Sequence, residues 1–311
     1  MANSAGQYRP RPQSLRTNVR SFPTDFHCHP GTCGRIDFLM LAVTILGSGS
    51  AGNCALVETA SCRLLVDGGL SARQICARLE AAGVAPATIA GILITHEHID
   101  HASGLDVFCK KFQTPIYCNT LTADALRRSG RDDCRKDFRL FQSGAEFSVG
   151  DIVVQTFSVP HDAADPIGYV LHHGGASLGF CTDLGFATKL VHERLRNAAT
   201  VVIETNHDEK LLQEDSRRPW PVKQRIMSRH GHLSNTAAAE VLAALTTHGL
   251  RRAILGHLSR DCNTPDLALG AVRNRLAADG VTGTDVEVFC ASQKEISARF
   301  MVSQEEEMLP F

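Results

Sequence analysis

The chain has 311 residues, of which 43% are hydrophobic and 21% charged, with a formal net charge of −1. This size and apolar content suffice for one large domain, whereas the near-zero charge gives no global attraction to nucleic acid or membrane surfaces. No apolar stretch approaches the roughly 20 residues of a membrane span, so we expect no membrane association. The 11 cysteines form no Cys-x-x-Cys pair, which favours reduced thiols and a cytoplasmic location over a disulfide framework.

The first 39 residues differ in composition from the rest. Five arginines stand against two acids, four prolines interrupt the segment, and no apolar core of a secretory signal is present. We interpret residues 1–39 as a basic, disordered N-terminal extension, or as sequence upstream of a true start at Met40. Residues 40–311 are expected to form a single domain, since Met40 directly precedes the first expected strand.

A glycine-rich segment follows that first strand, Leu41–Leu46. Residues 47–52 spell G-x-G-x-x-G, and Asp67 falls twenty positions after the first glycine, which imitates the dinucleotide-binding fingerprint. That fingerprint requires a helix after the glycines, because the helix N-terminus holds the pyrophosphate. Residues 54–59 and 63–67 instead have the pattern of two strands around a turn. We therefore expect a hairpin and no nicotinamide cofactor.

Past the hairpin, expected strands alternate with expected helices, the order typical of α/β proteins. Ser71 fits a helix N-cap, with Ile75 and Leu79 on one face and Gly83 ending the helix. The other expected helices lie near residues 106–112, 121–129, 235–245 and 266–278. The other expected strands lie at residues 91–95, 115–118, 151–159, 167–171, 176–182, 200–204, 252–255 and 285–290.

The highest concentration of possible metal ligands follows the expected strand Gly91–Thr95, in the run His-Glu-His-Ile-Asp-His at residues 96–101. An isoleucine-rich run is typical of a buried strand, so the cluster is expected where that strand opens into a loop. Imidazole and carboxylate are favoured zinc ligands. Residues two apart can point the same way, so His96 and His98 can hold one ion while a second is reached by the next two side chains, Asp100 and His101. Asp at position 100 excludes the zincin pattern His-Glu-x-x-His.

The pattern His96-x-His98-x-Asp100-His101 resembles the signature of the metallo-β-lactamase fold family. The resemblance extends from about Met40 nearly to the C-terminus, and four further segments resemble the YycJ/WalJ-like branch: Gly47–Asn53, His161–Ala163, Gly231–Asn235 and His257–Ser259. It implies a four-layer αββα sandwich with two mixed sheets and with metals at one sheet edge.

The same resemblance implies the rest of a ligand set. Each member of that set again follows a short apolar run. His161 would be a third histidine, Asp183 the carboxylate that bridges two metals, and His257 the last histidine. Ligands on the ends of adjacent strands would produce this repeated pattern. The implied first site is His96, His98 and His161. The implied second site is Asp100, His101 and His257, with Asp183 shared and Asp67 bracing the metal loop by hydrogen bonding.

Two such ions, roughly 3.5–4 Å apart, share a hydroxide whose pKa falls towards 7. The expected reaction is therefore hydrolysis, with Asp100 among the catalytic residues. Zn²⁺ is the expected metal, and Mn²⁺ suits the same ligands.

The substrate class depends on a basic segment, residues 217–229, which holds five cations, Trp220 and no acid. Such a segment suits a phosphate backbone and a stacked base, although an ordinary basic surface helix has the same composition. His232 precedes a helix N-cap and offers a proton donor beside an anion site, or serves only in a capping loop. We expect His232 to be catalytic. The expected substrate-binding residues are Asn206, Arg225, Arg229 and Ser234.

Three functions remain open from the sequence. The resemblance favours a phosphodiesterase or exonuclease acting on nucleic acid. The same metals would also serve hydrolysis of a small acyl substrate, a thioester or a lactone. The third is a non-catalytic, metal-binding regulatory module.

Overall fold

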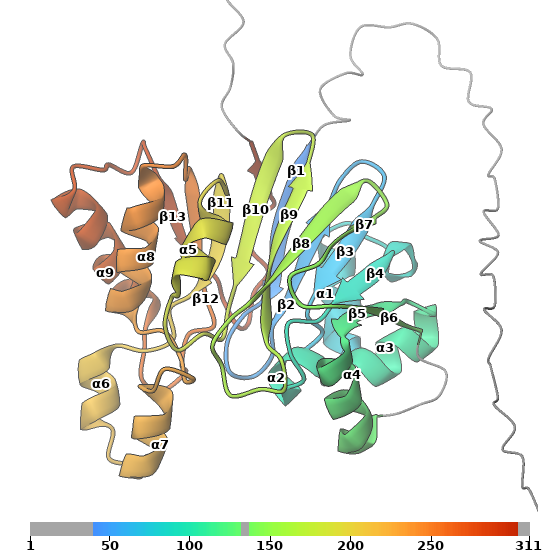
Figure 1. Ribbon diagram of the computed structural model, residues 1–311, viewed down its shortest axis with the longest axis horizontal. Coiled ribbons are helices and arrows are strands. Elements are labelled where there is room, and N and C mark those ends of the chain that lie inside the picture. The colour runs from blue at the N-terminus through green and yellow to red at the C-terminus, as the bar shows by residue number, and fades with distance from the viewer. Residues whose placement is uncertain (1–39, 132–136, 304–311) are drawn as a thin grey trace, which may run out of the picture. The chain divides into compact units, whose positions relative to one another are not determined.

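A computed structural model describes residues 40–131 and 137–303. The extension expected at residues 1–39 lies outside the described residues. The first sheet is built from seven strands (Figure 1): β1 (Leu41–Gly47), β2 (Cys54–Glu58), β3 (Arg63–Val66), β4 (Gly91–Leu93), β5 (Ile116–Asn119), β6 (Phe138–Phe141) and β14 (Phe300–Val302). The second sheet also has seven: β7 (Glu146–Val149), β8 (Ile152–Ser158), β9 (Ile167–His173), β10 (Ala176–Cys181), β11 (Thr200–Glu204), β12 (Arg252–Gly256) and β13 (Glu287–Cys290).

Both sheets are mixed, with strand orders β14-β1-β2-β3-β4-β5-β6 and β13-β12-β11-β10-β9-β8-β7. In each, a run of antiparallel strands is followed by parallel pairing, from β3 to β6 in the first sheet and from β10 to β13 in the second. The expected hairpin after the glycine loop is confirmed, because β2 and β3 pair antiparallel.

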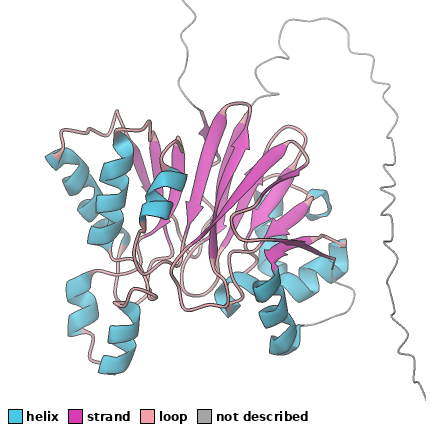
Figure 2. Ribbon diagram, viewed as in Figure 1, coloured by secondary structure: helices cyan, strands magenta, loops and turns pink. Residues whose placement is uncertain are grey.

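Helices cover the outer face of each sheet (Figure 2). Those in the first half are α1 (Ala72–Ala81), α2 (Ile99–Ala102), α3 (Leu105–Phe112) and α4 (Thr120–Leu126), with a 3-10 turn (Pro86–Thr88) and a π turn (Arg127–Arg131). Those in the second half are α5 (Lys189–Leu195), α6 (Glu209–Glu214), α7 (Trp220–Ile226), α8 (Asn235–Thr246) and α9 (Pro265–Ala278). Among the described residues, none of these helices has the length and hydropathy to cross a membrane.

Three apolar cores separate the four layers. One lies between the sheets, one between the first sheet and α1, α3 and α4, and one between the second sheet and α5, α8 and α9. The sequence explains α1 well, because Ser71 forms a capping box with Gln74 and the helix buries Ile75 and Leu79. The expected αββα sandwich with two mixed sheets is confirmed.

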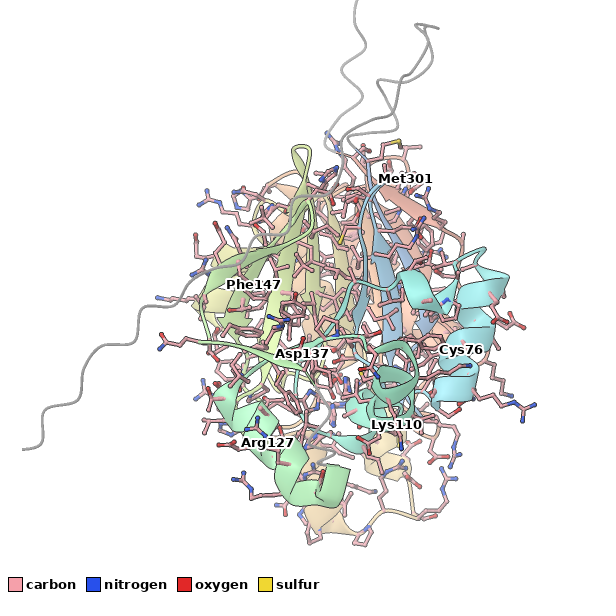
Figure 3. The ribbon with its side chains drawn as sticks, turned by 90° about the vertical axis from the view of Figure 1, so that its right-hand side faces the viewer. Cys76, Lys110, Arg127, Asp137, Phe147 and Met301 are labelled. Atoms are coloured by element: carbon pink, nitrogen blue, oxygen red, sulfur yellow. The ribbon has the colours of Figure 1, made fainter. Side chains whose placement is uncertain are left out.

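The chain passes from the first sheet to the second between β6 and β7, at the edge shown in Figure 3. There the ring of Phe147 stacks on Phe141, with ring centroids 4.9 Å apart, and on Tyr117 at 5.6 Å. Neither strand was expected, because both are short and only partly buried. The helices α5 and α6 were also not expected, whereas α7, which begins at Trp220 directly after a proline, lies in the basic segment for which a surface helix was one of two interpretations.

One local expectation was partly wrong. The residues after β4 were expected to form a loop, but Asp100 and His101 lie in the one-turn helix α2, with His98 at its N-cap. A helix of 4 residues is too short to produce a detectable apolar period.

Candidate metal centre

The expected ligands gather where strands of both sheets end. The segment of residues 96–101 follows β4, His161 follows β8, Asp183 follows β10 and His257 follows β12 directly. These strands run so that their carboxyl ends reach one edge of the sandwich (Figure 1). Segments far apart in the sequence therefore deliver their side chains to one place.

His96, His98 and His161 form one group, in which the possible donor atoms lie within 4.8 Å of one another. His161 Nε2 is 3.4 Å from His98 Nδ1, and His161 Nδ1 donates to the carbonyl of Gly231 at 2.9 Å. His96 is 1% exposed, and its Nε2 has no hydrogen-bond partner among the described residues. A buried imidazole nitrogen without a partner is costly unless something binds it.

Asp100, His101 and His257 form a second group within the same limit. His257 Nε2 lies 3.2 Å from a carboxylate oxygen of Asp100. Asp183 lies between the two groups: its Oδ2 is 3.0 Å from His101 Nε2, and its Oδ1 is 3.8 Å from His161 Nε2.

Three residues of the cluster have left-handed backbone conformations. The φ angles are 62° at Asp67, 56° at Asp183 and 53° at His257, each just after a strand. Non-glycine residues adopt this region rarely, and such strain persists only where the surroundings fix it. Its concentration here marks the sheet edge as a constrained site.

Asp67 holds the first half of the cluster from behind. Its Oδ2 accepts a hydrogen bond from His101 Nδ1 at 2.8 Å, and its Oδ1 accepts from the amide of Thr95 at 2.9 Å. Gly69 allows the helix α2 to approach, since a Cβ at this position would lie 1.7 Å from the carbonyl oxygen of Asp100. The hydrogen bonds expected of Asp67 are thus present.

Glu204 holds the second half, and sequence reasoning missed it. The side chain is fully buried, and its Oε1 accepts from the Nδ1 atoms of both His232 and His257 at 2.7 Å. Its Oε2 accepts from the backbone amides of Leu184 and Leu233 at 3.1 Å. The available signal was a carboxylate at the end of the apolar strand β11, the same pattern that the expected ligands follow.

The charges of the cluster shift its pKa values in opposite directions. Burial alone lowers the pKa of His257, but the charge of Asp183 and hydrogen bonds to Asp100 and Glu204 raise it to about 10. Burial raises the pKa of Glu204, but the imidazoles of His232 and His257 bring it down to about 2. The pKa of His96 lies well below its usual value because of burial and the charge of His101. His257 is therefore a paired imidazolium at neutral pH, whereas His96 is neutral.

His232 lies beside both groups of candidate ligands. Its ring centroid is 5.0 Å from that of His161 and 5.3 Å from that of His257. Burial lowers its pKa, but Glu204 outweighs this and raises it above the usual value. Because Glu204 occupies Nδ1, the other ring nitrogen is the one available to a reacting group.

The basic segment is largely neutralised by acids from elsewhere in the chain. Arg217 and Arg218 bind Asp215 and Asp261. Arg225 binds Asp162 at 2.5 Å, next to His161, and the Arg229 guanidinium lies 4.3 Å from the ring centre of Phe186. The segment itself contains no acid, but acids outside it pair with several of its arginines, so these arginines are not free.

Asn206 and Ser234 are buried and engaged inside the protein. The Asn206 amide donates to the carbonyl of His257 at 3.0 Å. Ser234 caps α8 and its hydroxyl donates to Glu209 at 2.7 Å. These contacts link loops of the protein to one another, and substrate binding by either residue stays a prediction.

The donor set fits divalent metal ions. Imidazole nitrogens and carboxylate oxygens are the ligands of zinc and similar metals, they converge within 4.8 Å in overlapping groups, and His96 Nε2 has no other partner among the described residues. Carboxylates on the far nitrogens of His101 and His257 are the usual support for metal-binding histidines.

Comparison with known proteins identifies the family. Residues 62–258 match the beta-lactamase superfamily domain. The chain is 37% identical over 241 residues to the exodeoxyribonuclease YycJ of Bacillus anthracis, covering 77% of this chain and 90% of the relative. It is also 37% identical over 253 residues to the exodeoxyribonuclease WalJ of Streptococcus pneumoniae, covering 80% and 93%. The crystal structure of the metallo-beta-lactamase fold protein YhfI from Bacillus subtilis shares the fold, with a TM-score of 0.65, 16% identity, and coverage of 84% of this chain and 100% of that one. The chain therefore belongs to the beta-lactamase superfamily and, within it, to the branch that contains YycJ and WalJ.

Proposed function

We propose that this protein is a metal-dependent hydrolase that removes nucleotides from an end of DNA by cleaving phosphodiester bonds. The observation that carries the proposal is the double donor cluster, in which Asp183 lies between two histidine-containing groups. The names of the two relatives, which the chain matches over at least 90% of their length, support DNA as the substrate. A cytoplasmic location is part of the proposal, supported by eight cysteines of the described ranges that are thiols and not half of a disulfide.

In this proposal two divalent ions occupy the cluster, zinc with manganese also suited. The first would be held by His96, His98 and His161. The second would be held by Asp100, His101 and His257, and Asp183 would offer a carboxylate to each group. When bound, such ions lower the pKa of water for attack and stabilise charge that develops on a phosphoryl oxygen.

The protein's own side chains orient this site. Asp67 and Glu204 occupy the Nδ1 atoms of His101 and His257, which fixes the ring orientations and directs the Nε2 atoms into the cluster. Asp100 lies against His257 Nε2 and completes the carboxylate side of the site. No large rearrangement is needed to form it.

His232 is the proposed proton donor to the leaving oxygen. Glu204 holds its Nδ1 and raises its pKa above the usual value, which favours the protonated ring. A side chain with 18% exposure is accessible to a bound substrate and still partly shielded from water. Proton donation of this kind contributes about 10²–10⁴-fold to a rate.

The test is hydrolysis by purified protein loaded with zinc or manganese. The substrates are single- and double-stranded DNA labelled at either end, RNA of the same sequence, and a panel of thioesters and lactones. We expect stepwise shortening of DNA from one end. Turnover of the acyl panel without DNA cleavage would move the assignment to an acyl hydrolase, and no turnover at all would favour a metal-binding regulatory module.

A matched pair of variants ties any activity to the cluster. Asp183→Ala removes the carboxylate between the two groups, so activity should fall by orders of magnitude. Asp285→Ala makes the same chemical change in an exposed turn, where the carboxylate bonds only to Thr282 among the described contacts. Activity that survives Asp183→Ala would reject this site as the source of hydrolysis.

A further inference from the structure

A cavity of about 680 Å³ opens beside the candidate metal centre. It lies between the glycine loop after β1, the segment that follows His257, and the loop after β13. The residues that matter below are Ser48, Leu258, Arg260, Pro265, Ala291 and Lys294. Pockets of about 300–1,000 Å³ accept small molecules, so a single nucleotide fits this volume.

The cavity adjoins the cluster through Ser48. The Ser48 hydroxyl accepts a hydrogen bond from the backbone amide of His257 at 2.8 Å and donates to Asn53 at 3.1 Å. The Asn53 amide nitrogen is in turn 3.2 Å from His101 Nε2. One wall of the cavity is thus fixed to two candidate metal ligands.

Positive charge dominates the lining. Its cations are Arg218, Arg260 and Lys294, and its acid is Asp261. Arg218 binds Asp261 at 3.1 Å. Arg260 is 3.9 Å from the same carboxylate with 87% of its side chain exposed, and the exposed Lys294 has no ion pair within the described ranges. In contrast to Arg225 of the basic segment, these last two cations are available to an anion.

The cavity walls are held in place without a ligand. The Gln293 side chain donates to the carbonyl of Gly52 at 2.8 Å and accepts from the amide of Ala51 at 2.9 Å. Arg78 donates to the carbonyls of Leu46 and Gln293 at 2.6 and 3.0 Å. A preformed pocket costs less free energy to fill, because little ordering accompanies binding.

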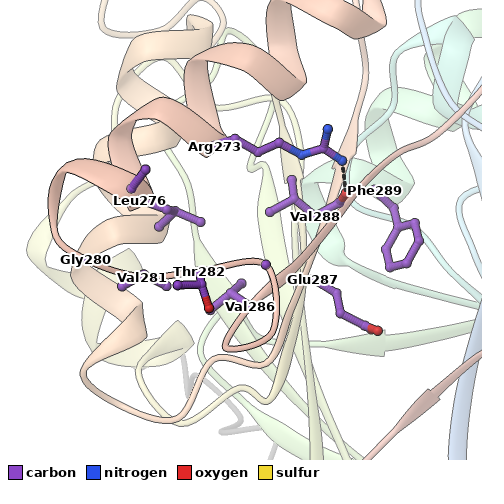
Figure 4. A pocket seen from close by; sticks show the side chains of 11 residues that line it. Arg273, Leu276, Gly280, Val281, Thr282, Val286, Glu287, Val288 and Phe289 are labelled. Atoms are coloured by element: carbon purple, nitrogen blue, oxygen red, sulfur yellow. Dashed lines mark hydrogen bonds between the residues drawn. The ribbon is translucent and has the colours of Figure 1, made fainter.

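A second cavity differs from this one in the charge of its lining and in its distance along the chain from the candidate ligands. It occupies about 580 Å³ between α9 and β13 (Figure 4) and is lined largely by apolar side chains such as Leu276 and Val286. Its arginine, Arg273, donates to the carbonyl of Val288 at 3.3 Å. No candidate metal ligand lines either cavity, but the first is lined by Leu258, which directly follows His257, and by Ser48, which binds the backbone amide of His257. Phosphate recognition beside the cluster therefore favours the first cavity.

We propose that the first cavity binds one unpaired nucleotide of the DNA strand next to the bond that is cut. Arg260 and Lys294 contact its phosphate, while Leu258, Pro265 and Ala291 provide apolar surface for its sugar and base. This inference rests on the proposed function. It assigns the positioning of the strand end to the cavity and not to the segment of residues 217–229.

The experiment compares two double variants with the same change of charge. Arg260→Ala/Lys294→Ala alters the cavity, whereas Arg73→Ala/Lys110→Ala removes two exposed cations from α1 and α3. Binding of a fluorescent single-stranded oligonucleotide is measured by anisotropy in the Asp183→Ala background across salt concentrations. Hydrolysis of the oligonucleotide and of bis(p-nitrophenyl) phosphate is measured in the otherwise wild-type protein.

We expect the cavity variant to bind the oligonucleotide about tenfold more weakly, with the salt slope flattened by roughly one unit per lost phosphate contact. Its kcat/KM should fall about tenfold more for the oligonucleotide than for the small diester. Equal losses in the two double variants, or equal losses on both substrates, would overturn the cavity assignment. Failure of the wild type to cleave any DNA would reject the proposed function separately, and the binding comparison would still decide whether the cavity holds a nucleotide.

Discussion

Two buried carboxylates, Asp67 in the first half of the chain and Glu204 in the second, hold the cluster from opposite sheets. Asp67 binds His101 and Thr95, which lie within one short segment after β4. Glu204 binds His232, His257 and two backbone amides, which come from three separate loops. Both carboxylates follow or end a strand, but Glu204 connects three loops of the site whereas Asp67 connects residues of one segment. More of the site therefore depends on Glu204.

The largest effect is expected from Glu204→Gln. A glutamine keeps the size but has one acceptor oxygen in place of two, so it cannot serve two imidazoles and two amides together. Because both the proposed proton donor and a candidate ligand lose their support, kcat/KM on DNA should fall about 10³-fold, within the range for loss of a proton-transfer group. Steady-state kinetics beside Asp67→Asn checks this, and a smaller loss than in Asp67→Asn would reverse the comparison.

Asp67→Asn should act mainly on one ion. His101 loses its charged partner, so affinity for the second metal should fall by about 10–100-fold, the usual cost of losing such a support. Affinity for the first ion should change little, because the three histidines that hold it do not bond to Asp67 in the structure. Competition with a chelator measures both affinities, and a parallel loss at both sites would show that Asp67 braces the whole cluster.

The pH dependence of metal binding should separate the two groups further. The pKa of His257 is raised to about 10 and that of His101 lies well above its usual value, since Asp183 and Asp67 outweigh burial. An ion at the second site must therefore displace protons, so its affinity should rise with pH between pH 6 and 9. Burial lowers the pKa values of His96 and His161, so binding at the first site should be nearly independent of pH above neutrality. Calorimetry in buffers of different ionisation enthalpy counts the protons released, and equal release at both sites would contradict this difference.

The same difference between Asp67 and Glu204 explains which site residues could be predicted from the sequence. The segment of residues 96–101 could be recognised because its donors are adjacent in the chain, whereas the role of Asp67 was implied by the resemblance. The resemblance supplied His161, Asp183 and His257. Glu204 has no partner near it in the sequence, so its function depends on a fold that brings three loops together.

Substrate binding by the basic segment stays a prediction, and the partners of its arginines could not be predicted for a related physical reason. Its composition correctly described five cations without a local acid, but Arg225 meets Asp162 and Arg229 meets Phe186 only after folding. The cavity beside Ser48 could not be anticipated either, because its walls come from loops more than 200 residues apart, as in the contact between Ser48 and His257. The alternation of apolar strands and amphipathic helices predicted an α/β protein, and the resemblance implied the sandwich.

The most direct test of the double cluster is anomalous diffraction at the zinc edge from crystals of the zinc-loaded protein. Two peaks are predicted, roughly 3.5–4 Å apart, the first at about 2.0–2.1 Å from nitrogens of His96, His98 and His161. The second should be bound by Asp100, His101 and His257, with the Asp183 carboxylate contacting both. A single peak, or a second peak that Asp183 does not touch, would contradict the account.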